Sequence, residues 1–313
     1  MRDVYSRIEL TKGNHLRYWF NDDPTQHWRG HPYEVAHMSI GTEEPVNDLG
    51  FVESLMETAR TLVNRHGDRF RLFLSGGLDS EVACRAFVKA GLRFIPTTIR
   101  FSNDLNKEDF HMATALCQEL GLEQEVLDLD PTDFMRSGDW KRIAIEYQCY
   151  TFYQQLLIGI AEKLSSPMIT IDEIEITKST DGWNFIKKED QDGCWHRFVE
   201  KTGIPAYNNF YTYDVNTIVR FLKSPTIQQL VNDQIPGKLG WTSSKHAVYS
   251  ELTGFNMLNR PKRHGMERMM HIWYHVQEET AMILHDSPVT FSFESNGLLN
   301  QLVSKGSITC NTL

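Results

Sequence analysis

The chain has 313 residues, of which 41% are hydrophobic and 23% are charged, and its formal net charge is −9. These values are typical of a soluble globular protein with one large domain, or one domain and a smaller addition, and no apolar run approaches the ~20 residues that a membrane span needs. The acidic balance argues against a protein dedicated to nucleic acid, whose surface is usually basic.

The five cysteines are widely spaced, and no two of them form a CxxC pair. This spacing argues against a zinc ribbon, a cysteine-ligated cluster or a disulfide framework, and it favours a reducing compartment. The first residues also lack the apolar core of a secretory signal. We therefore expect a cytoplasmic enzyme or binding protein, in which Cys84 and Cys117 are buried thiols on predicted helices.

Residues 1–50 contain aromatic residues and turn signals and are predicted to form a short β-rich N-terminal segment. Residues 51–180 then alternate helical and strand patterns. Helices are predicted at 53–67, 79–91, 106–121 and 153–165, and strands at 69–75, 93–101, 123–130 and 167–172. Strands separated by helices of this length indicate βαβ units, so the predicted fold class is α/β with a parallel sheet.

The pattern changes after Asp172. Residues 181–313 are predicted to form a mostly helical lobe on the substrate side, with an inserted β-hairpin at 183–201. The hairpin is expected to turn at "DQDG", where Gly193 suits the turn. The aromatic stretch "YNNFYTY" (207–213) has no interleaved basic residues, so we expect it to pack in the interior.

The six residues "SGGLDS" (75–80) join a predicted strand to a predicted helix. Ligands of open parallel sheets bind beyond the carboxyl ends of the strands, where this loop is expected. Adjacent glycines let the backbone approach a phosphate, and the first turn of the following helix offers its N–H groups to the anion. No Lys-Ser or Lys-Thr pair follows the glycines, so the loop is not a Walker A sequence. The pattern favours a phosphate-binding loop over a tight turn without a ligand.

The stretch "LSGGLDS" (74–80) resembles the SGGxDS signature of the PP-loop ATP pyrophosphatases, which have an adenine nucleotide α-hydrolase-like fold. Later segments follow the order of the synthetase domain of asparagine synthetases and β-lactam synthetases. In chain order they are "DLNKEDFHMATALCQELG" (104–121), "TIDEIEI" (170–176), "RFLKSPTIQQLVNDQIP" (220–236), "SSKHAVYSEL" (243–252) and "RPKRHGM" (260–266). The first motif is the most specific of them.

This resemblance implies an ATP-dependent, AMP-forming ligase. Such an enzyme adenylates a carboxylate, releases pyrophosphate, and forms an amide with ammonia or an amine. ATP and Mg²⁺ are the implied cofactors, and a small carboxylate and an amine or ammonia are the implied substrates. No membrane partner is expected, a nucleic-acid partner is disfavoured, and an oligomer is compatible with the sequence.

The resemblance also assigns roles to individual residues. The implied ATP- and pyrophosphate-binding residues are Ser75, Gly76, Gly77, Leu78, Asp79, Ser80 and Arg263. The implied magnesium ligands are Asp79 and Glu175, and the implied catalytic residues are Lys262, Asp172 and Lys245. Adenine recognition is expected on the backbone near Leu74 and at 99–101.

Two of these assignments have plain alternatives in the residues themselves. The segment 172–175 reads equally as a solvated acidic turn after a strand. The basic groups of 260–268 suit a polyphosphate, and the alternative is a solvated basic loop. The members of this basic cluster are Arg260, Lys262, Arg263, His264 and Arg268.

The chain departs from the family pattern in two places. Glutamine-dependent asparagine synthetases carry a cysteine as residue 2 and a long glutaminase domain, whereas this sequence has Arg2 and about fifty residues before the synthetase-like part. The expected nucleophile is therefore free ammonia, an amine or an intramolecular group. The glycines of the family's "SGEGSDE" motif are missing from "TIDEIEI".

Other functions remain open at this point. Thiolation of a tRNA base would need a cysteine pair and a basic surface, and zinc-dependent nitrile formation would need its cysteines; none of these is evident. Sulfonucleotide reduction would need a C-terminal cysteine motif, for which Cys310 stands alone. An ATP-binding module without turnover is the alternative from a different class, and the weakened second acidic motif favours it.

Overall fold

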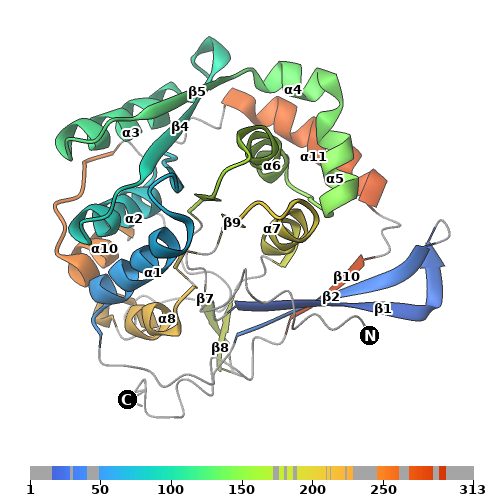
Figure 1. Ribbon diagram of the computed structural model, residues 1–313, viewed down its shortest axis with the longest axis horizontal. Helices are drawn as coiled ribbons and strands as arrows, with labels where there is room; N and C mark the ends of the chain where they lie inside the picture. The colour runs from blue at the N-terminus through green and yellow to red at the C-terminus, as the bar shows by residue number, and fades with distance from the viewer. Residues whose placement is uncertain are drawn as a thin grey trace.

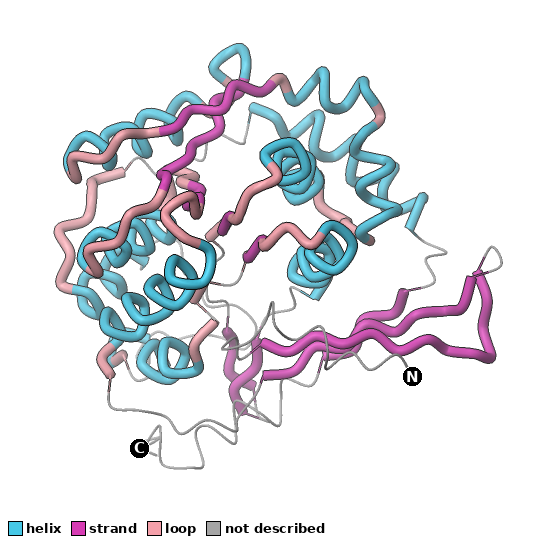
Figure 2. Tube along the Cα trace, viewed as in Figure 1, coloured by secondary structure: helices cyan, strands magenta, loops and turns pink. Residues whose placement is uncertain are grey.

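The structure, a computed structural model, has two layers of helices around a central sheet (Figures 1 and 2). It describes residues 16–28, 31–40, 49–171, 176–179, 182–185, 189–208, 210–211, 213–222, 224–227, 245–260, 268–284 and 289–293. The strands are β1 (Leu16–Trp28), β2 (His31–Ile40), β3 (Arg71–Phe73), β4 (Ile95–Phe101), β5 (Glu125–Leu129), β6 (Met168–Ile169), β7 (Ile176–Ser179), β8 (Gly182–Phe185), β9 (Ala206–Tyr207) and β10 (Val289–Phe293). The helices are α1 (Phe51–His66), α2 (Leu78–Lys89), α3 (Lys107–Glu119), α4 (Pro131–Ser137), α5 (Asp139–Tyr147), α6 (Phe152–Leu164), α7 (Glu189–Thr202), α8 (Val215–Leu222), α10 (Lys245–Thr253) and α11 (Met270–Leu284).

The central sheet has five strands in the order β5-β4-β3-β6-β9. Every neighbouring pair in it is parallel. Numbered along the chain, the order is 3-2-1-4-5, so the chain moves outward from β3 to β5 and then returns to the other side of β3. The α/β class and the parallel sheet are confirmed. In such sheets the ligand crevice lies at the carboxyl ends of the strands, where the direction of winding reverses, which here is at the end of β3.

Two hydrophobic cores lie on opposite faces of this sheet. Because side chains alternate along a strand, Leu72 of β3 faces one core and Phe73 faces the other. Ile169 and Met168 of β6 divide in the same way. Helices α1, α2 and α3 cover the first core, and α5, α6 and α7 cover the second (Figure 1). The cores fix β3 from both faces, and with it the loop that follows.

Two further sheets lie outside the central one. Strand β2 pairs antiparallel with β1 and parallel with β10, which comes from the far end of the chain. Strands β7 and β8 form a separate antiparallel pair. Strand β9 belongs to the second half of the sequence and extends the central sheet next to β6. The division into domains at 50 and 180 stays a prediction.

The expected hairpin at 183–201 is wrong. Strand β8 ends at Phe185, and the "DQDG" of the expected turn lies within helix α7. The apolar residues of this segment recur at helical spacing and are all buried in the second core: Cys194, Trp195, Phe198 and Val199. One buried face formed by residues i, i+1, i+4 and i+5 requires a helix, because a strand would place i and i+1 on opposite sides.

Several smaller expectations concern burial. Cys84 and Cys117 are buried as predicted, and burial raises the pKa of the Cys117 thiol to about 11. Four aromatic residues of the stretch 207–213 are buried in the first core, which confirms their expected packing: Tyr207, Phe210, Tyr211 and Tyr213.

Of the helices in the described part of the chain, none combines the length and the apolar character needed to cross a membrane.

The protein should lose stability as the pH falls from about 6.5 to about 4, in part because of His66. Its Nε2 atom lies 2.8 Å from the hydroxyl oxygen of Tyr207. Burial, helped by the neighbouring Arg65, lowers the pKa of His66 from 6.5 to about 4. Between these values the unfolded chain binds a proton that the native chain does not, so acid favours unfolding, whereas above pH 6.5 the group contributes no slope.

The measurement is urea denaturation from pH 7.5 to pH 4.5 for the wild type and for His66→Gln. We expect a shallower pH dependence in the variant. His196, whose pKa burial lowers to about 3, acts in the same direction and is present in both proteins. Parallel curves would show that His66 has no part in the acid sensitivity.

Candidate functional site

The predicted phosphate loop lies between β3 and α2, at the carboxyl edge of the central sheet. Gly76 has φ +77°, a conformation that L residues with a side chain seldom adopt. A Cβ atom at Gly76 would lie 2.2 Å from the backbone oxygen of Asp109, at the start of α3. Glycine is therefore required here for two independent reasons: the backbone conformation and the close approach of another main chain.

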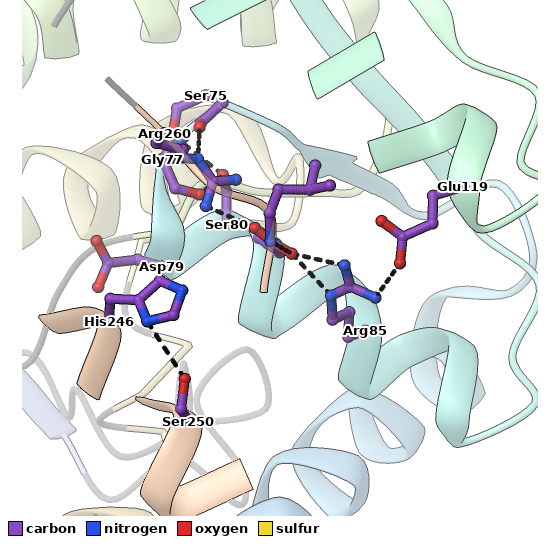
Figure 3. Close-up of polar contacts among 12 residues, drawn as sticks. Ser75, Gly77, Asp79, Ser80, Arg85, Glu119, His246, Ser250 and Arg260 are labelled. Atoms are coloured by element: carbon purple, nitrogen blue, oxygen red, sulfur yellow. Dashed lines mark hydrogen bonds and ion pairs between the residues drawn. The ribbon is translucent and has the colours of Figure 1, made fainter. Parts of the chain in front are cut away.

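The main-chain carbonyl groups of Gly76 and Gly77 both accept hydrogen bonds from side chains, and Figure 3 shows Arg260, Gly77 and Ser80 together. Arg260 donates from Nε to the Gly76 carbonyl over 2.6 Å. Ser80 donates its hydroxyl to the Gly77 carbonyl over 2.9 Å, and the Glu81 N–H binds the same oxygen. In a trans peptide the N–H points away from the carbonyl, so these bonds fix the N–H groups of Gly77 and Leu78 in the opposite direction.

The hydroxyl of Ser75 lies on the N–H side of the first loop peptide, and that of Ser80 is close to it. The Gly77 N–H donates to the Ser75 hydroxyl oxygen over 3.3 Å, and this oxygen lies 3.2 Å from that of Ser80. The first helical hydrogen bond of α2 uses the N–H of Glu81, so the N–H groups of residues 78–80 precede it. Main-chain N–H groups, two hydroxyls and the positive end of a helix together suit a phosphate group.

Asp79 is bound on both carboxylate oxygens by side chains of α10. Lys245 lies with Nζ 2.8 Å from Oδ2, and Tyr249 donates its hydroxyl to Oδ1 over 2.5 Å. The side chains of Asp79 and Lys245 are only 18% and 12% exposed. Tyr211 donates to the main-chain carbonyl of Asp79 over 2.6 Å and stacks on Tyr249. The two implied site residues Asp79 and Lys245 are therefore in direct contact.

Glu81 is fully buried and forms ion pairs with two arginines. Arg85, one turn further along α2, lies 2.7 Å from Oε1 and also binds Glu119 of α3. Arg260 approaches from the far part of the chain, with Nη1 2.5 Å from Oε2, although the angle is not that of a hydrogen bond. The N–H of Leu258 binds Oε1 as well. Glu81 thus ties residues 258–260 to the helix that follows the phosphate loop.

Of the expected basic cluster, the structure describes the first member, Arg260, and the last, Arg268. Arg260 contacts Gly76, as above. Arg268 donates to the Asp104 carbonyl and to Glu108, in the turn before α3 and its first residues. Lys262, Arg263 and His264 lie outside the described residues, and the proximity of their side chains to the loop stays a prediction.

The strand end expected to read adenine already has internal partners. The Asn106 carboxamide accepts from the Phe101 N–H and donates to the Ile99 carbonyl. Asn106 is buried, with a 7% exposed fraction. These two main-chain groups of 99–101 are therefore satisfied by the protein itself, through a side chain that directly precedes α3.

The structure brings together Ser75, Gly76, Gly77, Leu78, Asp79, Ser80 and Lys245 of the predicted site residues. Asp172 and Glu175 lie outside the described residues, so their predicted roles stay untested. Within the described ranges, no group of three or more His, Cys, Asp or Glu side chains is placed to hold a metal ion.

Three residues of the site were not predicted from the sequence: Tyr249, Tyr211 and Glu81. Tyr249 follows Lys245 by four residues, so one turn of helix puts both on the same face of α10, and this spacing was a usable signal. Glu81 and Arg85 have the same spacing on α2. The contact of Tyr211 with Asp79 carries no local signal, because 132 residues separate them.

No protein-family model matches the sequence, and no curated protein matches it. Among solved structures, the chain is similar to the NMN synthetase from Francisella tularensis, with 17% identity, a TM-score of 0.29, and coverage of 74% of this chain and 96% of that chain. It is also similar to the glutamine-dependent NAD⁺ synthetase from Acinetobacter baumannii, solved in complex with ADP. That match has 13% identity, a TM-score of 0.29, and coverage of 80% of this chain and 51% of that chain.

Proposed function

We propose that the chain is an ATP-dependent, AMP-forming ligase of the asparagine synthetase type. A carboxylate oxygen of the substrate attacks the α-phosphorus of ATP, the bond to the β-phosphate oxygen breaks, and pyrophosphate leaves. The nitrogen of ammonia or an amine then attacks the acyl carbon of the adenylate. AMP departs, the nitrogen loses a proton, and an amide is formed.

The orientation of the phosphate loop is the observation that carries this proposal. Arg260 binds the carbonyl of Gly76, and Ser80 and the Glu81 N–H bind that of Gly77. The N–H of Gly77 is directed at the hydroxyl of Ser75, whose oxygen lies 3.2 Å from that of Ser80. A site at the switch point of a parallel sheet with this donor set stabilises the negative charge that develops on departing pyrophosphate. The SGGLDS sequence adds the link to ATP.

The other roles are assigned to residues on either side of this loop. Lys245, held at Asp79, supplies positive charge beside the first turn of α2. Lys262 and Arg263 follow Arg260, which contacts the loop carbonyl, and we propose that they bind the polyphosphate. Asp172 follows β6, the strand next to β3, and is proposed to help position the substrate or accept a proton.

Mg²⁺ fits this scheme through Asp79 and Glu175, and when bound it neutralises charge on the phosphate oxygens. Asp79 is a carboxylate in the first turn of α2, next to the proposed phosphate position. In the present arrangement Lys245 and Tyr249 satisfy both of its oxygens. Each carboxylate oxygen can accept a second partner, so a metal ion held by Asp79 would share an oxygen with Lys245 or Tyr249, and the nearby lysine charge would oppose it.

The same contacts favour a second candidate, an ATP-binding module without turnover. If the charge of Lys245 at Oδ2 keeps a metal ion away from Asp79, the phosphate loop still offers its N–H groups to ATP, but the metal carboxylate is missing. Such a protein would bind ATP and release no pyrophosphate.

The test is pyrophosphate release from ATP and Mg²⁺ with a panel of carboxylates and with ammonium or amines. The ligase should release pyrophosphate and AMP in equal amounts, and only with a particular acid. We expect Lys262→Ala to lower the rate at least ~100-fold, because it removes a charge that acts on the transition state. Lys163→Ala is the matched control, since Lys163 is exposed on the last turn of α6.

The alternatives give different products. ATP binding without pyrophosphate release, under any combination of substrates, would refute the ligase and leave the binding module. Release of ADP and inorganic phosphate would point to cleavage at the γ-phosphate and would contradict both the ligase and the module. A similar loss of rate in Lys163→Ala would show that the effect of Lys262→Ala is not specific to the site.

A further inference from the structure

The structure assigns a positioning role to Arg260: it fixes the orientation of the peptide between Gly76 and Gly77. Arg260 lies 184 residues from Gly76 in sequence, yet its Nε donates to the Gly76 carbonyl over 2.6 Å. The orientation of this peptide follows from the hydrogen bond to Arg260. That the peptide binds phosphate is a further step, which rests on the proposed function.

Within the loop, the Gly76–Gly77 peptide is held by one long hydrogen bond, from the Gly77 N–H to the Ser75 hydroxyl over 3.3 Å, and it needs a further restraint from outside. Gly76 has a positive φ, and neither glycine has a side chain, so the backbone at both positions is unusually free to rotate. A rotation of this peptide by half a turn would replace the Gly77 N–H by the Gly76 carbonyl oxygen. An oxygen directed at the phosphate position would repel the anion instead of binding it.

Arg260 is itself held firmly. Its Nη1 pairs with Glu81, which has no exposed surface, and only 13% of the arginine side chain is exposed. Glu81 is the first residue of α2 to donate a helical N–H, and that bond goes to the Gly77 carbonyl. Glu81 therefore restrains both loop peptides. Its carboxylate anchors Arg260, which holds the Gly76 carbonyl, and its backbone N–H holds the Gly77 carbonyl.

Arg85 provides a matched control. It binds the same carboxylate as Arg260, with Nη2 2.7 Å from Glu81, and its side chain is 9% exposed. Its other ion pair is with Glu119, and neither of these two carboxylates belongs to the loop. Removal of either arginine takes one cation from Glu81, but only the removal of Arg260 releases the Gly76 carbonyl.

The experiment follows the Gly77 amide directly by NMR on full-length protein labelled with ¹⁵N-glycine. A Gly77→Ala spectrum assigns the resonance. We expect Arg260→Gln to shift or broaden the Gly77 signal and Arg85→Gln to leave it in place. Arg260→Lys guards against a loss of folding, because it keeps a positive charge next to Glu81. The single lysine nitrogen cannot replace both Nε and Nη1, so the Gly77 signal should move here too.

Titration with inorganic pyrophosphate provides the second readout. We expect the dissociation constant for pyrophosphate to rise about tenfold in both Arg260 variants and to stay within about twofold in Arg85→Gln. The reason is that only the Arg260 variants lose the charge-assisted hydrogen bond from the Gly77 N–H to the anion. If the Gly77 signal and the pyrophosphate affinity respond alike in the Arg260 and Arg85 variants, the positioning role is refuted. If wild type binds no pyrophosphate but the Gly77 signal still moves only in the Arg260 variants, the peptide restraint stands and the proposed function fails.

Discussion

Gly76→Ala will destabilise the protein by about 3 kcal/mol and, under the proposed function, abolish pyrophosphate binding. About 1 kcal/mol comes from the positive φ, which a Cβ atom disfavours. The larger part comes from the Asp109 main chain, whose oxygen, Cα and carbonyl carbon would lie 2.2 to 2.8 Å from the new atom. Backbone atoms cannot rotate away as a flexible side chain does, so α3 or the loop must shift, at a cost of about 1–3 kcal/mol.

Gly91→Ala separates these two contributions. Gly91 lies just beyond the other end of the same helix, has φ +70°, and has no atom within 4 Å of the position of a Cβ. Its replacement should cost only the conformational part, about 1 kcal/mol, and should leave pyrophosphate binding unchanged. Urea denaturation of both variants gives the comparison. Equal losses of stability would show that the approach of Asp109 does not constrain Gly76.

The features that the sequence predicted well are local. The αβ alternation and the helix that ends before Gly91 depend on residues adjacent in the chain. The loop depends on six consecutive residues, and its glycines have the role expected of them, since Gly76 takes a positive φ. The short helix α4 was equally local but was not recognised, although Asp130 caps it through the N–H groups of Thr132 and Asp133 and Pro131 occupies its first position.

Two kinds of feature were not predicted from the sequence. One is contacts between residues far apart in the chain, and the other is a segment whose pattern of apolar residues fits either a helix or a strand. Helix α7 was taken for a hairpin because a polar run with a glycine resembles a turn, and only the burial of residues 194–199 on one face decides for a helix. The contacts of Arg260 with Gly76 and of Tyr211 with Asp79 join segments more than a hundred residues apart. No local pattern specifies such a pair, because both the loop and its partner are determined only when the sheet and its helices have packed.

Asp79→Asn will destabilise the protein by about 2 kcal/mol, and under the proposed function it will lower pyrophosphate release at least ~100-fold. The amide keeps the size of the carboxylate but removes the negative charge that lies 2.8 Å from Lys245. A fully buried pair would lose more, but both side chains keep some contact with water, which screens the interaction. Adding Lys245→Met to Asp79→Asn should restore about 1 kcal/mol, because the lysine charge is then no longer held in a site that has lost its carboxylate. Urea denaturation of the two single variants and the double variant gives this coupling.

The Mg²⁺ dependence of ATP binding distinguishes a metal ligand from a purely structural carboxylate at position 79. Lys245 places its positive charge at Oδ2 of Asp79, where it would repel a metal ion bound by the same carboxylate. If Asp79 holds the metal, Asp79→Asn removes a ligand and should raise the Mg²⁺ concentration needed for half-maximal binding about tenfold. Lys245→Met removes the competing cation and should lower that concentration. The two variants of one ion pair should therefore shift the Mg²⁺ titration in opposite directions, as measured by calorimetry of ATP binding at fixed Mg²⁺ concentrations. A shift in the same direction, or none in either, would contradict metal binding by Asp79 and leave the carboxylate with the role of neutralising Lys245.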